Sequence, residues 1–421
     1  MTAKFRLVVL LLVSVTIILA GCSSSTPASS TSSGDSGDKT PIKIGLLEDQ
    51  SGDFAIVGQY KYHAAQLAVE EINNAGGIMG SQVELVAPDP QSNNQRYQEM
   101  ARKLILEDKV DVVFGGITSA SREAIRPIMD QNKMLYFYNQ QYEGGVADHY
   151  TFATGVVPDH QVVTLLPDLI KEYGPNIYTI AADYNFGQIT AQWVKKVAEE
   201  NGGKIIGEEF VPLGVSQFSS SINKIQQAKP DILITLLAGG PQYSFFEQWG
   251  KSGIKGVPMA STVTIAEAYE HKQFKPPALA NMYVTAPFIE ELATKSPEAK
   301  QFVDNYRKKF PDDPYIGMEA ETEYTAFYLY KAAVEKAGTT DKEAVIKALE
   351  SGISYDGPAG KVTIDGKTHH VIKDLWLIRT DDKQNIEFVK KLEQIHPDWL
   401  SKEKGVDLTQ KNDNKQYTPL D

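Results

Sequence analysis

The sequence is short of positive charge: 42 Lys and Arg stand against 54 Asp and Glu, which gives a net charge of -12. An acidic surface favours solubility and offers no electrostatic footprint for nucleic acid. The seven histidines are scattered along the 421 residues, so the sequence contains no group with the spacing of metal ligands. We therefore expect no nucleic-acid partner, no metal site and no cofactor.

The sequence also lacks the short signatures of common enzyme classes. It has no G-x-S-x-G nucleophile elbow, no H-E-x-x-H zinc motif and no phosphate loop of the P-loop type. A hydrolase needs a nucleophile beside a base, and Ser119 has no histidine close to it in the sequence. We expect a binding protein rather than an enzyme, with an amide hydrolase as the less favoured alternative.

Only one stretch is apolar enough to interact with a membrane, and it lies at the N-terminus. Residues 7–20 follow the basic Lys4 and Arg6 but are too short to span a bilayer, which favours a signal peptide. Small residues then precede the single cysteine, Cys22. This arrangement resembles the bacterial lipobox, which implies that residues 1–21 are removed and that Cys22 is lipidated. An ordinary signal peptide that happens to contain a cysteine is the alternative.

Residues 22–40 are rich in Ser, Thr and Gly and cannot bury a core. Such a composition is typical of a flexible tether. No later stretch is apolar for long enough to cross a bilayer. The folded part is therefore expected outside the cytoplasm and anchored by lipid to the cell membrane, at a bacterial surface or in a periplasm.

After the tether, short apolar runs alternate with amphipathic segments. Residues 42–47 predict a strand, and apolar positions at helical spacing over residues 60–72 predict the next helix. This alternation restarts near residue 162, so it indicates two α/β series with parallel sheets. Further strands are predicted over 83–87, 112–114, 134–138, 177–182, 204–211, 231–237, 258–261 and 282–285, and helices over 95–106, 162–173, 186–200 and 218–228.

The last third of the sequence has a different pattern. Amphipathic helices are predicted over 299–310, 320–337 and 342–351, followed by short strands near 362–364, 375–378 and 387–389 that complete an antiparallel edge. Residues beyond 397 are polar and are expected to be extended.

Polar residues follow two neighbouring strands where each strand ends. Thr118 and Ser119 come after the run at 112–114, and Asn139 and Gln140 come after the run at 134–138. In open α/β sheets, ligands bind beyond the carboxyl ends of the strands. Hydroxyl residues at this position are also typical helix caps, so both roles are open for Thr118 and Ser119.

Three stretches resemble the substrate-binding lipoproteins of ABC importers, of the leucine/isoleucine/valine-binding type. They are residues 67–80 (LAVEEINNAGGIMG), 212–214 (PLG) and 356–360 (DGPAG). Residues 142–144 (YEG) and the pair His369-His370 are closer to the urea and short-chain amide branch. The resemblance covers about residues 42–395.

The resemblance implies an α/β type 1 periplasmic-binding fold, with two Rossmann-like lobes joined by a three-crossover hinge that closes on a ligand. One lobe would comprise residues 41–157 and 287–352, the other residues 158–286 and 353–395, and residues 396–421 would form a polar tail. The implied partners are the permease and ATPase subunits of an ABC importer. A ligand-binding sensor would share the same fold and pocket, and it stays open as an alternative.

The resemblance also carries ligand contacts over to this sequence. Two positions depart from the amide branch, where an aromatic residue is common at Ile117 and a proline at Asn139. Thr262 and Thr264 are weaker matches than the others. The residues that match the ligand contacts of the family are Thr118, Ser119, Tyr138, Asn139, Gln140, Tyr184 and Thr262.

None of these candidates carries a full charge at neutral pH. An anionic ligand needs charge-assisted bonds, but Arg122 and Arg126 are expected on the solvated face of their helix. The expected ligand is therefore small, polar and uncharged: urea, a short-chain amide, or a neutral or branched-chain amino acid. Because no candidate offers a carboxylate for an ammonium group, urea or an amide is favoured.

Overall fold

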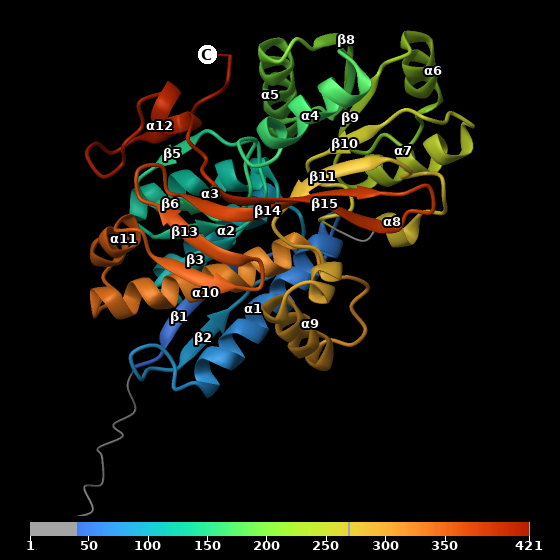
Figure 1. Ribbon diagram of the computed structural model, residues 1–421. Helices are drawn as coiled ribbons and strands as arrows, with labels where there is room; N and C mark the ends of the chain where they lie inside the picture. The colour runs from blue at the N-terminus through green and yellow to red at the C-terminus, as the bar shows by residue number, and fades with distance from the viewer. Residues whose placement is uncertain (1–39, 268–269, 421) are drawn as a thin grey trace, which may run out of the picture. The chain divides into compact units, whose positions relative to one another are not determined.

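Residues 40–267 and 270–420 are described by a computed structural model (Figure 1). Cys22, the signal peptide over 1–21 and nearly all of the tether lie outside the described residues and stay predictions. No helix within the described ranges is long and apolar enough to cross a membrane.

Five parallel strands form the first sheet, in the order β2-β1-β3-β4-β6. Gly115 ends β3 with a φ of 117°, and a Cβ there would lie 2.4 Å from the carbonyl oxygen of Leu47. Only glycine therefore lets β3 approach the end of β1 this closely. The strands are β1 (Ile42–Leu47), β2 (Val83–Val86), β3 (Val112–Gly115), β4 (Tyr136–Tyr138) and β6 (Thr151–Ala153), with helices α1 (Ala55–Asn74), α2 (Asn94–Leu106) and α3 (Ser119–Asn132).

The second sheet runs β12-β13-β14-β11-β10-β9-β7-β8, and β15 pairs with β14. Its strands from β11 to β8 are parallel, whereas β14 pairs with β11, β13 and β15 in the antiparallel sense. The two predicted α/β series are thus confirmed. The parallel strands are β7 (Asn176–Ala182), β8 (Lys204–Val211), β9 (Ile232–Leu236), β10 (Met259–Ser261) and β11 (Met282–Ala286), and their helices are α4 (Val162–Tyr173), α5 (Asn185–Glu200), α6 (Ser219–Ala228), α7 (Gly240–Lys251) and α8 (Glu270–Gln273).

The remaining elements complete both parts of the fold. Helix α10 packs along α1, and β12 to β15 extend the second sheet as the predicted antiparallel edge. These elements are η1 (Glu290–Thr294), α9 (Pro297–Lys309), α10 (Met318–Ala337), α11 (Lys342–Glu350), β12 (Ser354–Gly357), β13 (Gly360–Asp365), β14 (His370–Thr380) and β15 (Ile386–Ile395).

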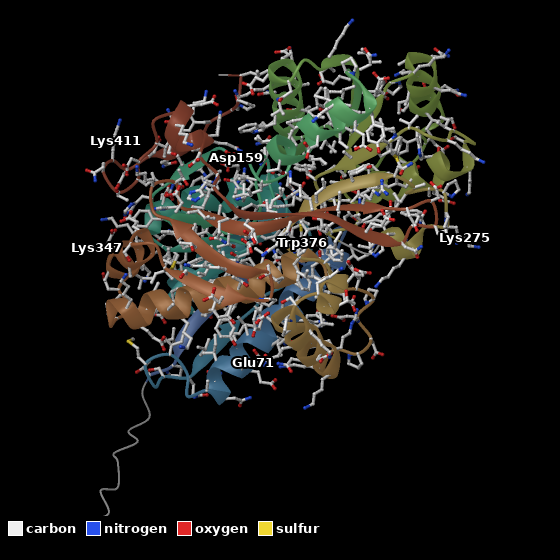
Figure 2. The ribbon with its side chains drawn as sticks, viewed as in Figure 1. Glu71, Asp159, Lys275, Lys347, Trp376 and Lys411 are labelled. Carbon is white, nitrogen blue, oxygen red and sulfur yellow. The ribbon has the colours of Figure 1, made fainter. Side chains whose placement is uncertain are left out.

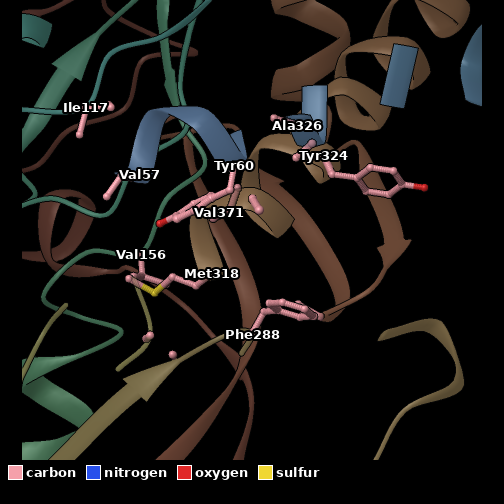
Figure 3. Packing of buried hydrophobic residues seen from close by; sticks show 14 of the residues in the cluster. Val57, Tyr60, Ile117, Val156, Phe288, Met318, Tyr324, Ala326 and Val371 are labelled. Atoms are coloured by element: carbon pink, nitrogen blue, oxygen red, sulfur yellow. The ribbon is translucent and has the colours of Figure 1, made fainter. Parts of the chain in front are cut away.

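One apolar cluster draws on both sheets and on the segments that connect them. Figure 3 shows part of it, with Val57 and Tyr60 of α1 near Met318 of α10 and near Val156 and Phe288. The first turns of α10 are enclosed by this cluster, so even the polar side chains of those turns are buried. This enclosure places charged groups of α10 inside the protein.

The expectation that residues beyond 397 are extended is wrong for the described part of this tail. It forms α12 (Trp399–Glu403) and β16 (Asn414–Gln416), and β16 pairs antiparallel with β5 (Val146–Asp148). The reason is a sparse set of apolar side chains, too widely spaced to show a period in the sequence, which are buried against α4 and α5. They are Trp399, Leu400, Val406 and Leu408.

Candidate functional site

The hydroxyl of Ser119 donates to a buried carboxylate. Ser119 is the first residue of α3, and its Oγ lies 2.5 Å from Oε2 of Glu143 in the loop after β4. Thr118 instead caps the helix, since its Oγ1 accepts from the backbone N–H of Ser121 at 3.0 Å. Because the proton of Ser119 is engaged by Glu143, the remaining lone pairs of its oxygen can only accept hydrogen bonds.

Arg122 lies behind this contact and is fully buried. Its Nη2 donates to Oε1 of Glu143 at 2.8 Å, and its guanidinium carbon lies 5.1 Å from the ring centroid of Tyr138 and 4.6 Å from that of Tyr142. Burial lowers the pKa of Arg122, but Glu143, Tyr138, Glu123 and Tyr142 together outweigh this effect and hold the pKa well above its usual value. Arg122 is therefore a permanently charged group inside the candidate site.

The prediction that Arg122 and Arg126 face solvent is wrong, because both are buried. Nη1 of Arg126 donates to Oδ2 of Asp148 at 2.8 Å. Both arginines also pair with Glu123 within α3, but their fully buried partners, Glu143 and Asp148, come from the segment after β4, so the spacing within α3 gives no sign of them.

Asn139 and Gln140 are both buried and have different partners. Oδ1 of Asn139 accepts from Oγ1 of Thr154 at 2.6 Å. Nε2 of Gln140 donates to Oε1 of Glu267 at 2.7 Å, and its Oε1 accepts from Nζ of Lys61 at 3.3 Å. Gln140 thereby joins the edge of the first sheet to the segment that follows β10 in the second.

Lys61 is surrounded by buried carboxylates that the sequence analysis missed. Its Nζ lies 2.9 Å from Oε1 of Glu48 and 3.8 Å from Oε2 of Glu323, and none of these three side chains is exposed. Burial raises the pKa of Glu323 to about 7, that of Glu319 to about 8 and that of Glu267 to about 7. Four acidic side chains therefore surround one ammonium group, and three of them have pKa values near or above 7, so this cluster holds protons as well as hydrogen-bond acceptors at neutral pH.

Two signals in the sequence point to this cluster. Glu48 directly follows the first predicted strand, so it shares the sheet edge with Ser119 and Gln140. Glu319 and Glu323 are four residues apart in α10, which puts them on one face of a helix that is otherwise largely apolar.

Tyr138 and Tyr184 lie close to the same charged groups. The hydroxyl of Tyr138 donates to the carbonyl oxygen of Ile117 at 2.9 Å, so this side chain offers its ring rather than its hydroxyl. Tyr184 precedes α5, and burial raises its pKa, with Glu143 and Glu267 raising it further. Tyr184 is therefore within electrostatic reach of both carboxylates.

Thr262 and Thr264 lie in the turn after β10, and both are buried. The carbonyl oxygen of Thr262 accepts from Nε2 of Gln161 at 2.5 Å, while its hydroxyl is buried with no hydrogen-bond partner among the described residues. Oγ1 of Thr264 donates to Oγ of Ser261 at 3.0 Å within the same turn. The hydroxyl of Thr262 therefore stays a predicted ligand contact, whereas the hydroxyl of Thr264 is engaged within its own turn.

Residues 41–385 match the periplasmic binding protein family. A Leu/Ile/Val-binding protein homolog 7 from Brucella suis is 26% identical over 378 residues, which cover 84% of this chain and 88% of the relative. A Leu/Ile/Val-binding protein homolog 6 from Brucella abortus is 22% identical over 344 residues, which cover 80% and 86%.

Solved structures are similar over most of the chain. The branched-chain amino acid transporter substrate-binding protein LivJ from Streptococcus pneumoniae, in complex with isoleucine, has a TM-score of 0.72 at 21% identity and covers 84% of this chain and 100% of its own. An ABC transporter solute-binding protein from R. palustris, in complex with 4-hydroxybenzoate, has a TM-score of 0.74 at 22% identity and covers 86% and 99%. At these identities the structures show a shared fold and not a shared ligand.

Proposed function

The chain belongs to the periplasmic binding protein family, whose members bind small molecules outside the cytoplasm and work with ABC transporters, and from this premise we propose that it delivers a small polar, uncharged solute to an importer. Closure of two lobes would trap the solute. Residues 41–157 with 287–352 would form one lobe, and residues 158–286 with 353–395 the other. The packing of α10 on α1 and the pairing of β14 with β11 support this division.

The acceptor-rich edge supports a ligand that carries N–H groups. The oxygen of Ser119 can only accept, because its hydrogen is donated to Glu143. Glu267 adds a carboxylate that already accepts from a side-chain amide, that of Gln140, at 2.7 Å. The N–H groups of urea or of a short-chain amide can donate to a carboxylate in the same way as the Gln140 side chain does.

The charges around Arg122 support a ligand whose second polar group, besides its N–H groups, is a neutral oxygen. The guanidinium of Arg122 is already paired with Glu143 and with Glu123, at 2.8 and 2.9 Å. A carboxylate in the ligand would add negative charge to a group of buried acids. A carbonyl oxygen would not, and Nη1 of Arg122 is buried without a hydrogen-bond partner among the described residues and can donate to it.

A neutral or branched-chain amino acid is the second candidate. The sequence offered no carboxylate for an ammonium group, but Glu267 beside Gln140 supplies one. The relatives from Brucella carry names that refer to leucine, isoleucine and valine. An amino acid has a carboxylate that urea and amides lack. The choice between the two candidates therefore depends on whether the site binds this carboxylate of the ligand.

A thermal-shift panel of urea, acetamide, formamide and the twenty amino acids tests the proposal. A ligand at a hundred times its dissociation constant should stabilise the protein by ~2.7 kcal/mol, which is a readily measured shift. Stabilisation by urea or an amide, without consumption of the compound, is the expected result. Stabilisation by an aliphatic amino acid alone would favour the second candidate, and a compound that disappears with time would contradict a binding role.

We also propose that Cys22 carries the lipid anchor and that permease and ATPase subunits are the partners. The lipobox-like sequence and the Ser-rich tether support the anchor. An importer role predicts uptake of the bound solute that depends on this protein, whereas a sensor would leave uptake unchanged.

A further inference from the structure

Gln416 reaches the candidate site from the tail of the chain. Its Nε2 donates to Oε1 of Glu143 at 2.7 Å and to the carbonyl oxygen of Gly144 at 2.9 Å. Its Oε1 accepts from Nη2 of Arg122 at 3.3 Å. One side-chain amide therefore binds both members of the buried Arg122–Glu143 ion pair.

The backbone fixes Gln416 at this position. β16 pairs with β5 in a register that sets Gln416 opposite Val146. The pairing extends by a hydrogen bond from the backbone N–H of Tyr417 to the carbonyl oxygen of Gly145 at 2.8 Å. A Cβ on Gly145 would lie 2.0 Å from the carbonyl oxygen of Tyr417, so the two strands are as close as a glycine allows. The register cannot slip without moving the amide away from Glu143.

The other end of the tail holds the same loop through α5. The ring of Trp399 packs edge-on against that of Trp193, with centroids 4.8 Å apart and an interplanar angle of 67°. Nε1 of Trp193 donates to the backbone carbonyl of Glu143 at 3.1 Å. The backbone N–H of Trp399 donates to Oδ1 of Asp159 at 3.0 Å, and Figure 2 labels Asp159 in this region. Two contacts thus hold Glu143. Gln416 of β16 binds its side-chain carboxylate, and Trp193 of α5, which packs against Trp399 of α12, binds its backbone carbonyl.

Three donors converge on the carboxylate of Glu143: Ser119, Arg122 and Gln416. The hydrogen of the Ser119 hydroxyl points to Glu143 only while that carboxylate stays in place. A displaced carboxylate would free the hydroxyl to donate to a ligand instead. The orientation of the Ser119 hydroxyl is then set indirectly by the residue that holds Glu143.

We propose that Gln416 is a positioning residue of the ligand site, and that it makes the site selective for N–H donors by fixing Glu143 against Ser119. This proposal rests on the function proposed above. Outer-shell partners of metal ligands typically change the affinity by about 10–100-fold, and we expect an effect at the lower end of this range here.

Gln416→Met tests this role because methionine keeps the length and volume of the side chain and removes the amide. Lys411→Ala is the matched control, since Lys411 is an exposed residue of the same tail (Figure 2). Amide hydrogen exchange of residues 140–146 provides a measurement without ligand. Gln416→Met should speed exchange in this loop, whereas Lys411→Ala should not. Unchanged exchange in Gln416→Met would overturn the proposal, whatever the ligand is.

Titrations with acetamide and acetone then test selectivity, because the two probes have similar size and only acetamide has N–H groups. The affinity ratio of acetamide to acetone should fall on the order of tenfold in Gln416→Met and stay unchanged in Lys411→Ala. Faster exchange with an unchanged ratio would overturn the selectivity role. Faster exchange with no binding of either probe to the unmodified protein would contradict the amide ligand and support the positioning of the loop.

Discussion

The side-chain amide of Gln140 donates to Oε1 of Glu267 at 2.7 Å and joins the edge of the first sheet to the segment after β10. The hydroxyl of Tyr60 also donates to the backbone carbonyl of Glu267. The backbone N–H of Met318 donates to the carbonyl oxygen of Ala266 at 2.8 Å. Separation of the two sheets at this point would break all three contacts, so Glu267 is a central residue of the contact that lobe closure would make.

Replacing Ser119 with alanine should weaken ligand binding. The change removes an acceptor at the sheet edge while Glu143 keeps two other donors, so the affinity should fall on the order of tenfold with little change in melting temperature. Ser121→Ala is the control, because the Ser121 hydroxyl donates to the carbonyl oxygen of Thr118, the cap residue of α3, at 2.8 Å and has no contact with Glu143 among the described hydrogen bonds. Calorimetric titration with the best compound of the panel measures both variants. Equal affinity in the two variants would exclude Ser119 from the site.

Lys61 should be indispensable for stability. Its ammonium group is the partner of the buried Glu48 and Glu323, and breaking a buried ion pair by removal of one member costs about 3–5 kcal/mol. Lys61→Met should lower the free energy of unfolding by that amount, and the added change Glu48→Gln should recover part of it. Guanidinium unfolding followed by circular dichroism measures the loss, and it avoids urea, which is a candidate ligand. A loss below 1 kcal/mol would show that the cluster is hydrated.

Glu319 should make stability depend on pH. Burial raises its pKa from 4.5 to about 8, with Glu267 raising it further and Lys61 lowering it. Between these pH values the folded protein holds a proton that the unfolded chain has released, so this contribution to stability is full below pH 4.5 and is lost as pH rises towards 8. As pH rises, the free energy of unfolding of Glu319→Gln should fall by on the order of 4 kcal/mol less than that of the unmodified protein. Melting temperatures from pH 5 to 8 measure it, and the exposed Glu107→Gln should leave the profile unchanged.

Cys22→Ala should release the protein from the membrane. Two or more acyl chains give stable attachment, whereas the chain without them keeps only its tether and folded part. Cell fractionation of the variant and of the unmodified protein measures the difference. A variant that stays in the membrane fraction to the same extent would mean that another anchor exists.

The fold followed from the sequence more completely than the site did. The predicted bounds of β1, β8 and α4 agree with the structure, since glycine or proline residues lie close to their ends, as in the stretches 202–203 and 212–214 that flank β8. Arg122 was misplaced because its partner, Glu143, comes from a loop beyond the next strand. The helical period of apolar residues in α3 identifies only the face that packs against the apolar core. Such a pairing is a property of the tertiary structure, and sequence spacing within one helix contains no trace of it.

The tail was misjudged for a related reason. Trp399 and Leu408 belong to a sparse set of apolar residues in a polar segment, and they are buried in one cluster with residues of α4 and α5, where the ring of Trp399 packs against that of Trp193. Propensity and periodicity describe segments that are stable through their own pattern. A segment whose structure depends on packing against residues far away in the sequence shows neither strong propensity nor clear periodicity.

Gln416 and Glu143 are 273 residues apart in the chain, and this separation makes their contact one of the last that folding can form. During synthesis β5 emerges long before β16, so the loop with Glu143 has no strand beside it until nearly all of the described chain has been made. Contacts of such long range form slowly and late in folding. The two sheets can therefore form before the carboxylate of Glu143 gains Gln416 as a hydrogen-bond donor.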